Sequence, residues 1–312
     1  MHNKKIKNKN ITFYSLLFFE KNEKITNLSR ILNKNKDYIY SKMALNLSKS
    51  IHNLGYQHVL VTNDKLKIRK LVNYKYPLKE LKFKKILDSN TRFYSAHYKI
   101  DVFKYLSNKK NRSCLLDLDI LIVKKFTKKF LSLSKHKNLI FSLNYDSGYN
   151  KKINFIFEKL CKFKIYKPKW YGGEFILGNS LFFKRLYIQI MKIYPNYKKN
   201  LNNFFFIGDE TLTNSALQIL LNKKKISFYD IRNCNFITRY WSILNYDLVK
   251  LNSVLRNIFL HLPSDKLFLS KNDISDYEYT DIKKMYLNYH QSYSRKILYL
   301  IQKLKRCLIK LN

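Results

Sequence analysis

The chain has 312 residues, of which 46% are hydrophobic and 16% aromatic, a composition that excludes wholesale disorder and allows one large domain or two smaller ones. Its 61 Lys and Arg against 21 Asp and Glu give a formal charge of +40, which first suggests a polyanionic partner such as nucleic acid or an anionic membrane. The basic residues are spread along the chain without a nucleic-acid recognition motif, so we favour a solvated basic surface over specific nucleic-acid binding. The 4 Cys are far apart, which is typical of a reducing cytoplasm and gives no zinc signature.

The N-terminus combines a basic stretch with an apolar one. Residues 1–10, MHNKKIKNKN, lead directly into ITFYSLLFF at 11–19, and no small-residue cleavage site of a signal peptide follows. No apolar stretch approaches the roughly 20 residues that span a membrane. We therefore expect 1–10 to be a disordered tail, 11–19 to be the first strand, and the protein to be cytoplasmic.

Strand and helix patterns alternate along the first half of the chain. The expected elements are a helix over 37–55 that stops at Gly55, a strand over 58–64, a helix over 91–106 and a strand over 113–123. This alternation predicts an α/β domain with a mostly parallel central sheet flanked by helices. Ligands of such sheets lie beyond the carboxyl ends of the strands, where Asp64, Asp117 and Asp119 are found.

The second half continues the pattern and then changes character. We expect a strand over 138–146, a strand from 170 followed by a helix that Pro195 closes, a helix over 208–221 and a strand over 225–231. No internal repeat and no Pro- or Gly-rich linker is present, so the simplest organisation is one domain over 11–280 with a C-terminal extension.

Residues 281–312 read as a basic amphipathic helical tail. Ile297, Leu300, Ile301 and Leu304 recur at helical spacing, with lysines and an arginine between the apolar positions. Such a helix can lie on an anionic membrane surface, here as a peripheral contact on the cytoplasmic face. It can also pack on its own domain or on a second subunit, which is the more frequent outcome.

The stretch LLDLDILIV places Asp117 and Asp119 inside an apolar run. In a strand these two side chains point to the same side, and two close carboxylates cannot both stay ionised without a proton or a cation. A divalent cation such as Mn²⁺ or Mg²⁺ neutralises them with oxygen ligands and leaves positions open for phosphates. The alternative is that the strand ends at Leu116 and both acids lie in a solvated turn.

Four of the 6 glycines fall in two segments that also carry acids, YGGEFILG at 171–178 with Glu174 and IGDE at 207–210 with Asp209 and Glu210. A chain so poor in glycine keeps it where backbone geometry or close approach requires it, although ordinary turns would also explain it. In FLHLPSDKL, the imidazole of His261 is a plausible third metal ligand beside the two aspartates, and Lys266 can meet a phosphate.

The order of these motifs resembles the GT-A glycosyltransferases, most closely nucleotide-diphospho-sugar transferases of the glycogenin and galactosyltransferase type. The resemblance implies that Asp117 and Asp119 hold a divalent cation against the donor diphosphate. DETLTN is similar to the family's D-Q-x-x-L-N motif and carries over Asp209, with Glu210 in place of Gln. HLPSDK approximates the family's H-x-x-G-x-K motif and carries over His261 and Lys266, with serine where glycine is usual.

The resemblance implies a metal-dependent glycosyltransferase with an Mn²⁺ or Mg²⁺ cofactor. A sugar would pass from a nucleotide-diphosphate donor, with UDP-sugar favoured, to a hydroxyl of a glycan or lipid-linked acceptor in cell-envelope polysaccharide synthesis. Tyr14 and Asp64 would lie near the donor's base and ribose, and Arg92 and Lys99 are candidates for diphosphate or ribose contacts, although a solvated helix face explains the latter two equally well.

On the acceptor side, Glu174, Asp209 or Glu210 would orient the hydroxyl, and one of them would be the general base if the anomeric centre is inverted. Two other classes stay open. The first is a basic nucleic-acid-binding protein without catalytic activity, and the second is a related nucleotidyltransferase, although the glycine-rich phosphate loops expected in many such enzymes are missing.

Overall fold

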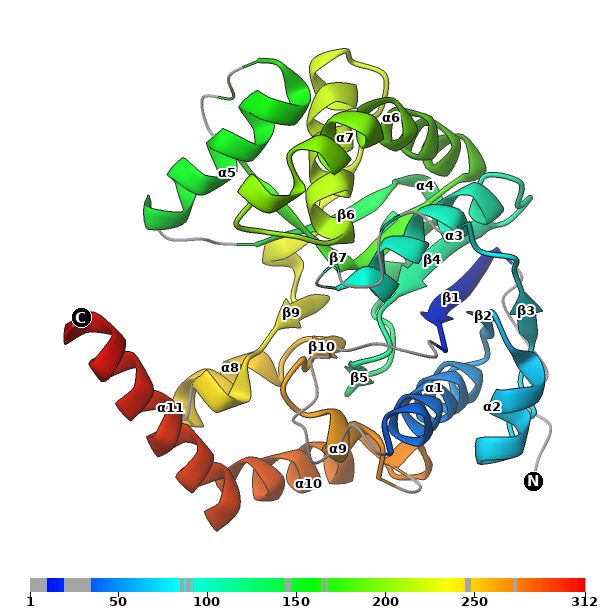
Figure 1. The fold of residues 1–312 in the computed structure, drawn as a ribbon. Coiled ribbons are helices and arrows are strands. Elements are labelled where there is room, and N and C mark those ends of the chain that lie inside the picture. The colour runs from blue at the N-terminus through cyan, green and yellow to red at the C-terminus, as the bar shows by residue number, and fades with distance from the viewer. Residues whose placement is uncertain are drawn as a thin grey trace.

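The computed structural model describes residues 10–19, 35–84, 87, 91, 93–143, 147–163, 165, 168–244, 248–271 and 274–311. Seven strands form the central sheet: β1 (Ile11–Leu17), β2 (Gln57–Thr62), β3 (Leu78–Glu80), β4 (Arg112–Leu116), β6 (Leu139–Leu143), β7 (Trp170–Gly178) and β8 (Tyr229–Asp230). Their order is β3-β2-β1-β4-β7-β6-β8 (Figure 1). β7 is antiparallel to both of its neighbours, β4 and β6, and the other neighbouring pairs are parallel. The expected mostly parallel α/β sheet is confirmed.

Helices cover both faces of this sheet (Figure 1). The long helices that connect or follow its strands are α1 (Lys36–Asn53), α2 (Lys65–Val72), α3 (Lys99–Leu106), α4 (Lys128–His136), α5 (Ser147–Cys161), α6 (Ser180–Lys199) and α7 (Asp209–Asn222). Successive side chains of each strand pack in different hydrophobic cores, because they point to opposite faces of the sheet. Tyr14 and Ile176 pack with α3, α5, α6 and α7, whereas Phe13 and Phe175 pack with α1 and α4.

A second, three-stranded sheet lies beside the first. It is made of β5 (Ile120–Ile122), β10 (Phe259–His261) and β9 (Ile237–Arg239), in that order. The expectation of one strand over 113–123 is therefore wrong. The chain leaves the large sheet after Leu116, turns at residues 117–119, and enters the small sheet at Ile120, so the two aspartates lie where the sheets meet.

Three further expectations on elements are corrected. The helix over 91–106 is a 3₁₀ turn at Tyr94–Tyr98 followed by α3, and only 229–230 of the strand over 225–231 pairs in the sheet. Pro195 does not close its helix, because α6 continues through it to Lys199. The buried side chains Ile193 and Tyr197 on either side of Pro195 keep this segment on the core, which offsets the one helical hydrogen bond that proline cannot donate.

The chain ends in helices α8 (Leu248–Val254), α9 (Lys266–Leu269), α10 (Tyr279–Gln291) and α11 (Tyr293–Leu311). Ile282 and Tyr286 of α10 are buried in a core shared with α1, α2 and β10. Among the helices that the structure describes, none combines the length and the apolar character needed to cross a bilayer. The expected tail at 1–10 lies outside the described residues except for Asn10, and the division of the chain at 280 stays a prediction.

Candidate active site

The turn between β4 and β5 holds Asp117 and Asp119 in place from both sheets. The Asp117 backbone N–H donates to the Glu174 carbonyl of β7 at 3.1 Å, and the Asp119 carbonyl accepts from Leu262 N–H at 2.9 Å. The strand does end at Leu116, as the alternative held, but the turn is not solvated. The Asp117 and Asp119 side chains are only 25% and 13% exposed. The two carboxylates therefore still need neutralising partners.

Asp119 receives two partners from the C-terminal part of the chain. His261, the last residue of β10, places Nε2 3.0 Å from Asp119 Oδ1, and Lys266, the first residue of α9, places Nζ 2.5 Å from Oδ2. Burial raises the pKa of Asp119, but the charges of Lys266 and His261 outweigh it and hold that pKa well below its usual range. Burial likewise opposes the charge on His261, yet Asp119 and Glu174 raise its pKa to about 9.

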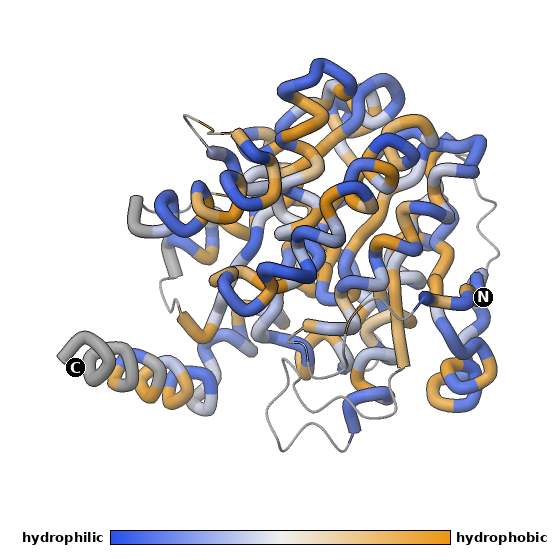
Figure 2. Tube along the Cα trace, turned by 45° about the horizontal axis from the view of Figure 1, so that its top comes forward, coloured by the Kyte–Doolittle hydropathy of each residue, from blue (hydrophilic) through white to orange (hydrophobic). Residues whose placement is uncertain are grey.

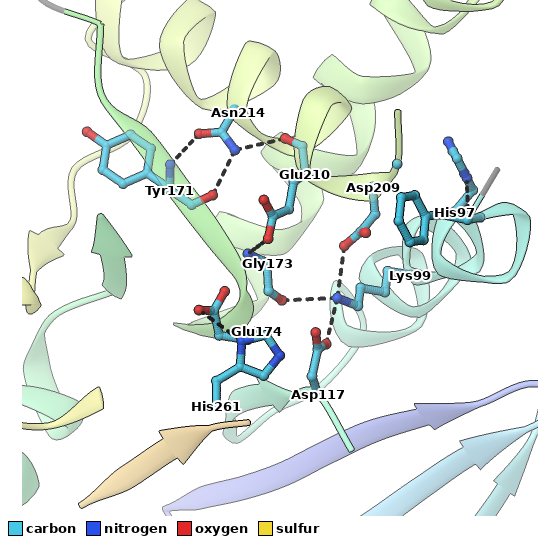
Figure 3. Close-up of polar contacts among 12 residues, drawn as sticks. His97, Lys99, Asp117, Tyr171, Gly173, Glu174, Asp209, Glu210, Asn214 and His261 are labelled. Atoms are coloured by element: carbon cyan, nitrogen blue, oxygen red, sulfur yellow. Dashed lines mark hydrogen bonds and ion pairs between the residues drawn. The ribbon is translucent and has the colours of Figure 1, made fainter. Parts of the chain in front are cut away.

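Asp117 has less positive charge near its carboxylate than Asp119 has. Lys99, at the start of α3, is shared among three groups, because its Nζ lies 2.6 Å from Asp117 Oδ1 and 2.9 Å from Asp209 Oδ2 and donates to Gly173 O at 3.2 Å (Figure 3). Burial, together with the neighbouring Asp119, outweighs the effect of Lys99 and raises the pKa of Asp117 to about 6. One lysine thus serves two buried carboxylates.

Behind these residues, Arg239 joins the two glutamates of the site. Its Nε and Nη2 donate to the two oxygens of the fully buried Glu174 at 3.0 and 2.6 Å, and Nη2 also pairs with Glu210 Oε1. Glu210 in turn accepts from Gly173 N–H at 3.1 Å and from Trp170 Nε1 at 2.9 Å. Burial raises the pKa of Glu174, but Arg239 and His261 hold it well below its usual range. Sequence reasoning missed Arg239, the last residue of β9.

Asn214 and Gly173 set helix α7 against strand β7, and Gly172 leaves room for Glu174 of the strand itself. The Asn214 amide accepts from Tyr171 N–H at 2.6 Å and donates to Tyr171 O at 2.8 Å, which ties the helix to the strand edge (Figure 3). A Cβ on Gly173 would lie 2.9 Å from Asp209 Oδ2, and one on Gly172 would lie 2.0 Å from Glu174 Oε2. The expected close approach at these glycines is therefore made by the chain's own acids.

Gly208 opens α7 with a backbone that only glycine adopts readily. Its φ is +147° and its ψ is −177°. The nearest atom to an added Cβ is 4.0 Å away, so backbone strain, and not crowding, opposes a side chain there. We expect Gly208→Ala to lower the free energy of unfolding by about 1–3 kcal/mol, measured by urea titration.

The matched control for that change is Gly55→Asn. Gly55 also has a positive φ, +82°, but this value is close to the left-handed region that asparagine tolerates. We expect this control to cost less than about 1 kcal/mol. If the two variants lost the same free energy of unfolding, backbone strain would not be the reason for a glycine at position 208.

A cavity of about 630 Å³ opens in front of these side chains, at the carboxyl ends of β1 and β4. Its polar lining contains several of the expected site residues and includes Lys99, Asp117, Asp119, Asp209, Glu210, Arg239, His261 and Lys266. Aromatic side chains also line it, among them Phe18, Tyr40, Trp170, Phe205 and Trp241. A volume of this size is typical of small-molecule and cofactor sites.

Other expected site residues are not brought to this cavity. Tyr14, Asp64 and Glu174 are not among the described residues that line it. Tyr14 points into the core beside α3, Asp64 caps α2 by accepting from Lys67 N–H at 2.8 Å, and Glu174 is fully buried behind His261. Arg92 lies outside the described residues. Glu174 supports the lining side chains and has no exposed surface to offer a ligand.

The charges of the site suit a divalent cation. Five carboxylates (Asp117, Asp119, Glu174, Asp209 and Glu210) face the three permanent cations Lys99, Lys266 and Arg239. This formally leaves one negative charge with His261 protonated, as its raised pKa indicates at neutral pH, and two when His261 is neutral, the form that binds a metal. Asp117, Asp119 and His261 each offer a ligand atom, and these atoms all lie within 4.8 Å of one another. Two carboxylate oxygens and an imidazole nitrogen form a donor set that can hold a metal ion.

Fold and site together define an α/β protein with a buried acidic and histidine cluster at the carboxyl edge of its sheet. No family model matches the chain, and neither does any curated protein. Among solved structures, the chain is similar to the apo structure of WbbM, a bifunctional glycosyltransferase, with a TM-score of 0.47 and 11% sequence identity. The match covers 88% of this chain and 51% of that one, so this chain spans about half its length. A likeness at this level concerns the backbone and carries no activity across.

Proposed function

We propose that the protein is a metal-dependent glycosyltransferase of the GT-A type that takes its sugar from a nucleotide-diphosphate donor. The observation that supports this best is the cluster of Asp117, Asp119 and His261, whose ligand atoms all lie within 4.8 Å of one another at a cavity large enough for a small molecule. A bound Mn²⁺ or Mg²⁺, held by these three residues, would act as a Lewis acid that neutralises charge on the leaving diphosphate. UDP-sugar is the favoured donor.

Two buried lysines at the cavity suit the donor's phosphates. Lys266 and Lys99 are 5% and 7% exposed, and both line the cavity. Carboxylates raise the pKa of each despite the opposing effect of burial, so both ammonium groups stay charged at neutral pH. Charges fixed in place before the reaction stabilise a developing anion without further reorganisation. We therefore assign Lys266 to the diphosphate and Lys99 to orienting Asp117.

The acceptor hydroxyl would meet the acids of α7. Asp209 lines the cavity at the N-terminal end of this helix, where the helix dipole favours a carboxylate. Both oxygens of Glu210 already accept hydrogen bonds, from Gly173 and Trp170, and Arg239 pairs with it as well. We propose that Asp209 orients the hydroxyl, accepting its proton if the reaction inverts the anomeric centre, while Glu210 holds the cavity wall. The acceptor would be a glycan or a lipid-linked sugar.

Metal removal tests this function directly. We expect the purified protein to hydrolyse at least one UDP- or GDP-sugar slowly in the presence of Mn²⁺ or Mg²⁺, measured as release of the nucleoside diphosphate. Chelation with EDTA should abolish the release, and re-addition of the metal should restore it. Without the metal, the negative charges of Asp117 and Asp119 would oppose the developing negative charge of the leaving diphosphate.

The alternatives predict different results in the same assay. Turnover that EDTA leaves unchanged would contradict the proposed role of the metal. Release of pyrophosphate from a nucleoside triphosphate would favour a nucleotidyltransferase. Tight, salt-sensitive binding of arbitrary nucleic acid without any donor turnover would favour a basic binding protein.

A further inference from the structure

Helix α11 leaves the rest of the molecule at the end of α10. Figures 1 and 2 show from two directions that it extends away from the sheets and the helices that cover them. Four apolar side chains of its described part, Ile297, Leu300, Ile301 and Leu304, are between 39% and 65% exposed. Their spacing of three and four residues places them along one stripe of the helix. The stripe therefore has no cover among the described residues.

The start of α11 is attached firmly to the body. Arg295, which is 6% exposed, pairs with the fully buried Asp265 and donates to Ser242 Oγ. Asp265 also accepts from Ser242 Oγ at 2.6 Å and from Tyr286 OH at 2.8 Å. A buried ion pair with these additional hydrogen bonds fixes the direction of the helix. The apolar stripe is therefore exposed on a helix whose first turn is fixed to the body of the protein.

The charge around the stripe is of one sign. Residues 282–312 contain eight Lys and Arg and no Asp or Glu. On a helical projection Lys296 and Lys303 both lie along one side of the stripe, and both are exposed. An apolar stripe flanked by lysines matches an anionic bilayer, in which the apolar side chains reach the acyl boundary and the lysines meet phosphate headgroups. The sign of the charge thus indicates the partner.

A second copy of the chain matches this surface less well. Pairing of two α11 stripes would bring the basic flanks of both helices together, and neither helix carries an acid to neutralise the other. Like charges at such a contact oppose association. Anionic lipid is the partner that covers the apolar stripe and also neutralises its flanks.

We propose that α11 docks the protein onto an anionic lipid surface, with Ile297, Leu300, Ile301 and Leu304 as the inserted residues. The proposal goes beyond the proposed transfer reaction and does not depend on it. The contacts of Arg295 with Ser242 and Asp265 also connect α11 with the cavity. Trp241, which precedes Ser242, and Lys266, which follows Asp265, both line that cavity. Docking would therefore set the position of the cavity relative to the lipid.

Vesicle flotation of the full-length protein tests this inference. We expect the protein to float with vesicles of phosphatidylcholine mixed with phosphatidylglycerol, much less with phosphatidylcholine alone, and less as salt is raised. The double variant Leu300→Glu/Leu304→Glu should bind the mixed vesicles at least about tenfold more weakly than wild type. The control Leu66→Glu/Leu181→Glu changes two exposed leucines elsewhere by the same charge, and we expect it to bind within about twofold of wild type.

A second pair of changes separates charge from apolar insertion. Lys296→Gln/Lys303→Gln should weaken binding to the mixed vesicles and flatten its salt dependence. Circular dichroism should show all variants folded, because every changed side chain is exposed. Equal flotation of wild type and the stripe variant would overturn the proposal, as would a wild type that never floats. A dimer in light scattering that the stripe variant abolishes, without flotation, would assign the stripe to a second copy instead.

Discussion

Replacing Asp119 with Asn is expected to abolish metal-dependent donor turnover, with a loss of more than about 100-fold in kcat/KM. The change keeps the shape of the side chain but removes the charge that faces both His261 and Lys266. Loss of a supporting group around a bound metal already costs about 10- to 100-fold, and the loss of a ligand should cost more. Calorimetric titration with Mn²⁺ in the absence of nucleotide should show a parallel loss of metal affinity, which makes the test independent of the donor.

The control for this prediction is Asp276→Asn. Asp276 pairs with Lys49 on the surface, where exposed ion pairs contribute little, so its loss should leave both turnover and metal affinity unchanged. Because Lys266 loses its partner in Asp119→Asn, urea titration should accompany the assay to show that the variant remains folded. A folded Asp119→Asn protein that turns over donor within threefold of wild type would refute the metal site.

The second large effect is expected on stability, from Arg239→Gln. Glu174 is fully buried, and Arg239 is its bidentate partner, so the variant removes the main counter-charge of an interior carboxylate and leaves it with His261, 3.4 Å away, as its remaining partner among the described residues. Removal of one member of a buried ion pair costs about 3–5 kcal/mol, and we expect a loss of that size at pH 7, measured by urea titration. Arg232→Gln, at an exposed arginine seven positions earlier, should stay within about 0.5 kcal/mol of wild type.

The double variant Arg239→Gln/Glu174→Gln separates the charge from the packing. It carries no unpaired carboxylate at position 174, so we expect it to recover more than half of the stability that Arg239→Gln loses. A double variant as unstable as the single one would mean that the arginine acts through packing or through Glu210.

The pH dependence of the Arg239→Gln effect has a defined sign. The pKa of Glu174 is depressed in the folded protein, so the stabilisation by Arg239 is present above the ordinary Glu range and is lost as the pH falls. The difference between wild type and Arg239→Gln should therefore shrink as the pH is lowered through that range. A difference that grows towards acid pH would contradict the pairing.

Several features of the site were predictable because they depend on local pattern. The apolar letters around Asp117 and Asp119 indicate that both carboxylates are withdrawn from water, and this holds although the strand ends before them. The scarcity of glycine indicates close approach at Gly172 and Gly173, and the structure places acids there. These inferences need only the chemistry of neighbouring residues.

Other features were not predictable, because they depend on which side chain faces which core. Tyr14 was expected near a strand end, but it is the middle residue of β1, and the alternation along this strand turns its side chain into the core beside α3. Arg239 gives no signal in the sequence, since a chain with 61 Lys and Arg offers many equivalent letters. Only its burial between two glutamates distinguishes it from the solvated ones.

By itself the sequence determined the alternation of strands and helices, the pair of carboxylates in an apolar run and the basic amphipathic C-terminus, because periodicity and composition act over a few residues. Only the tertiary structure decided how the charges balance. His261, Lys266 and Arg239 reach the acids from segments far along the chain, and a single Lys99 is divided between Asp117 and Asp209. Electrostatic energies depend on distance and burial in space, which no local pattern of letters contains.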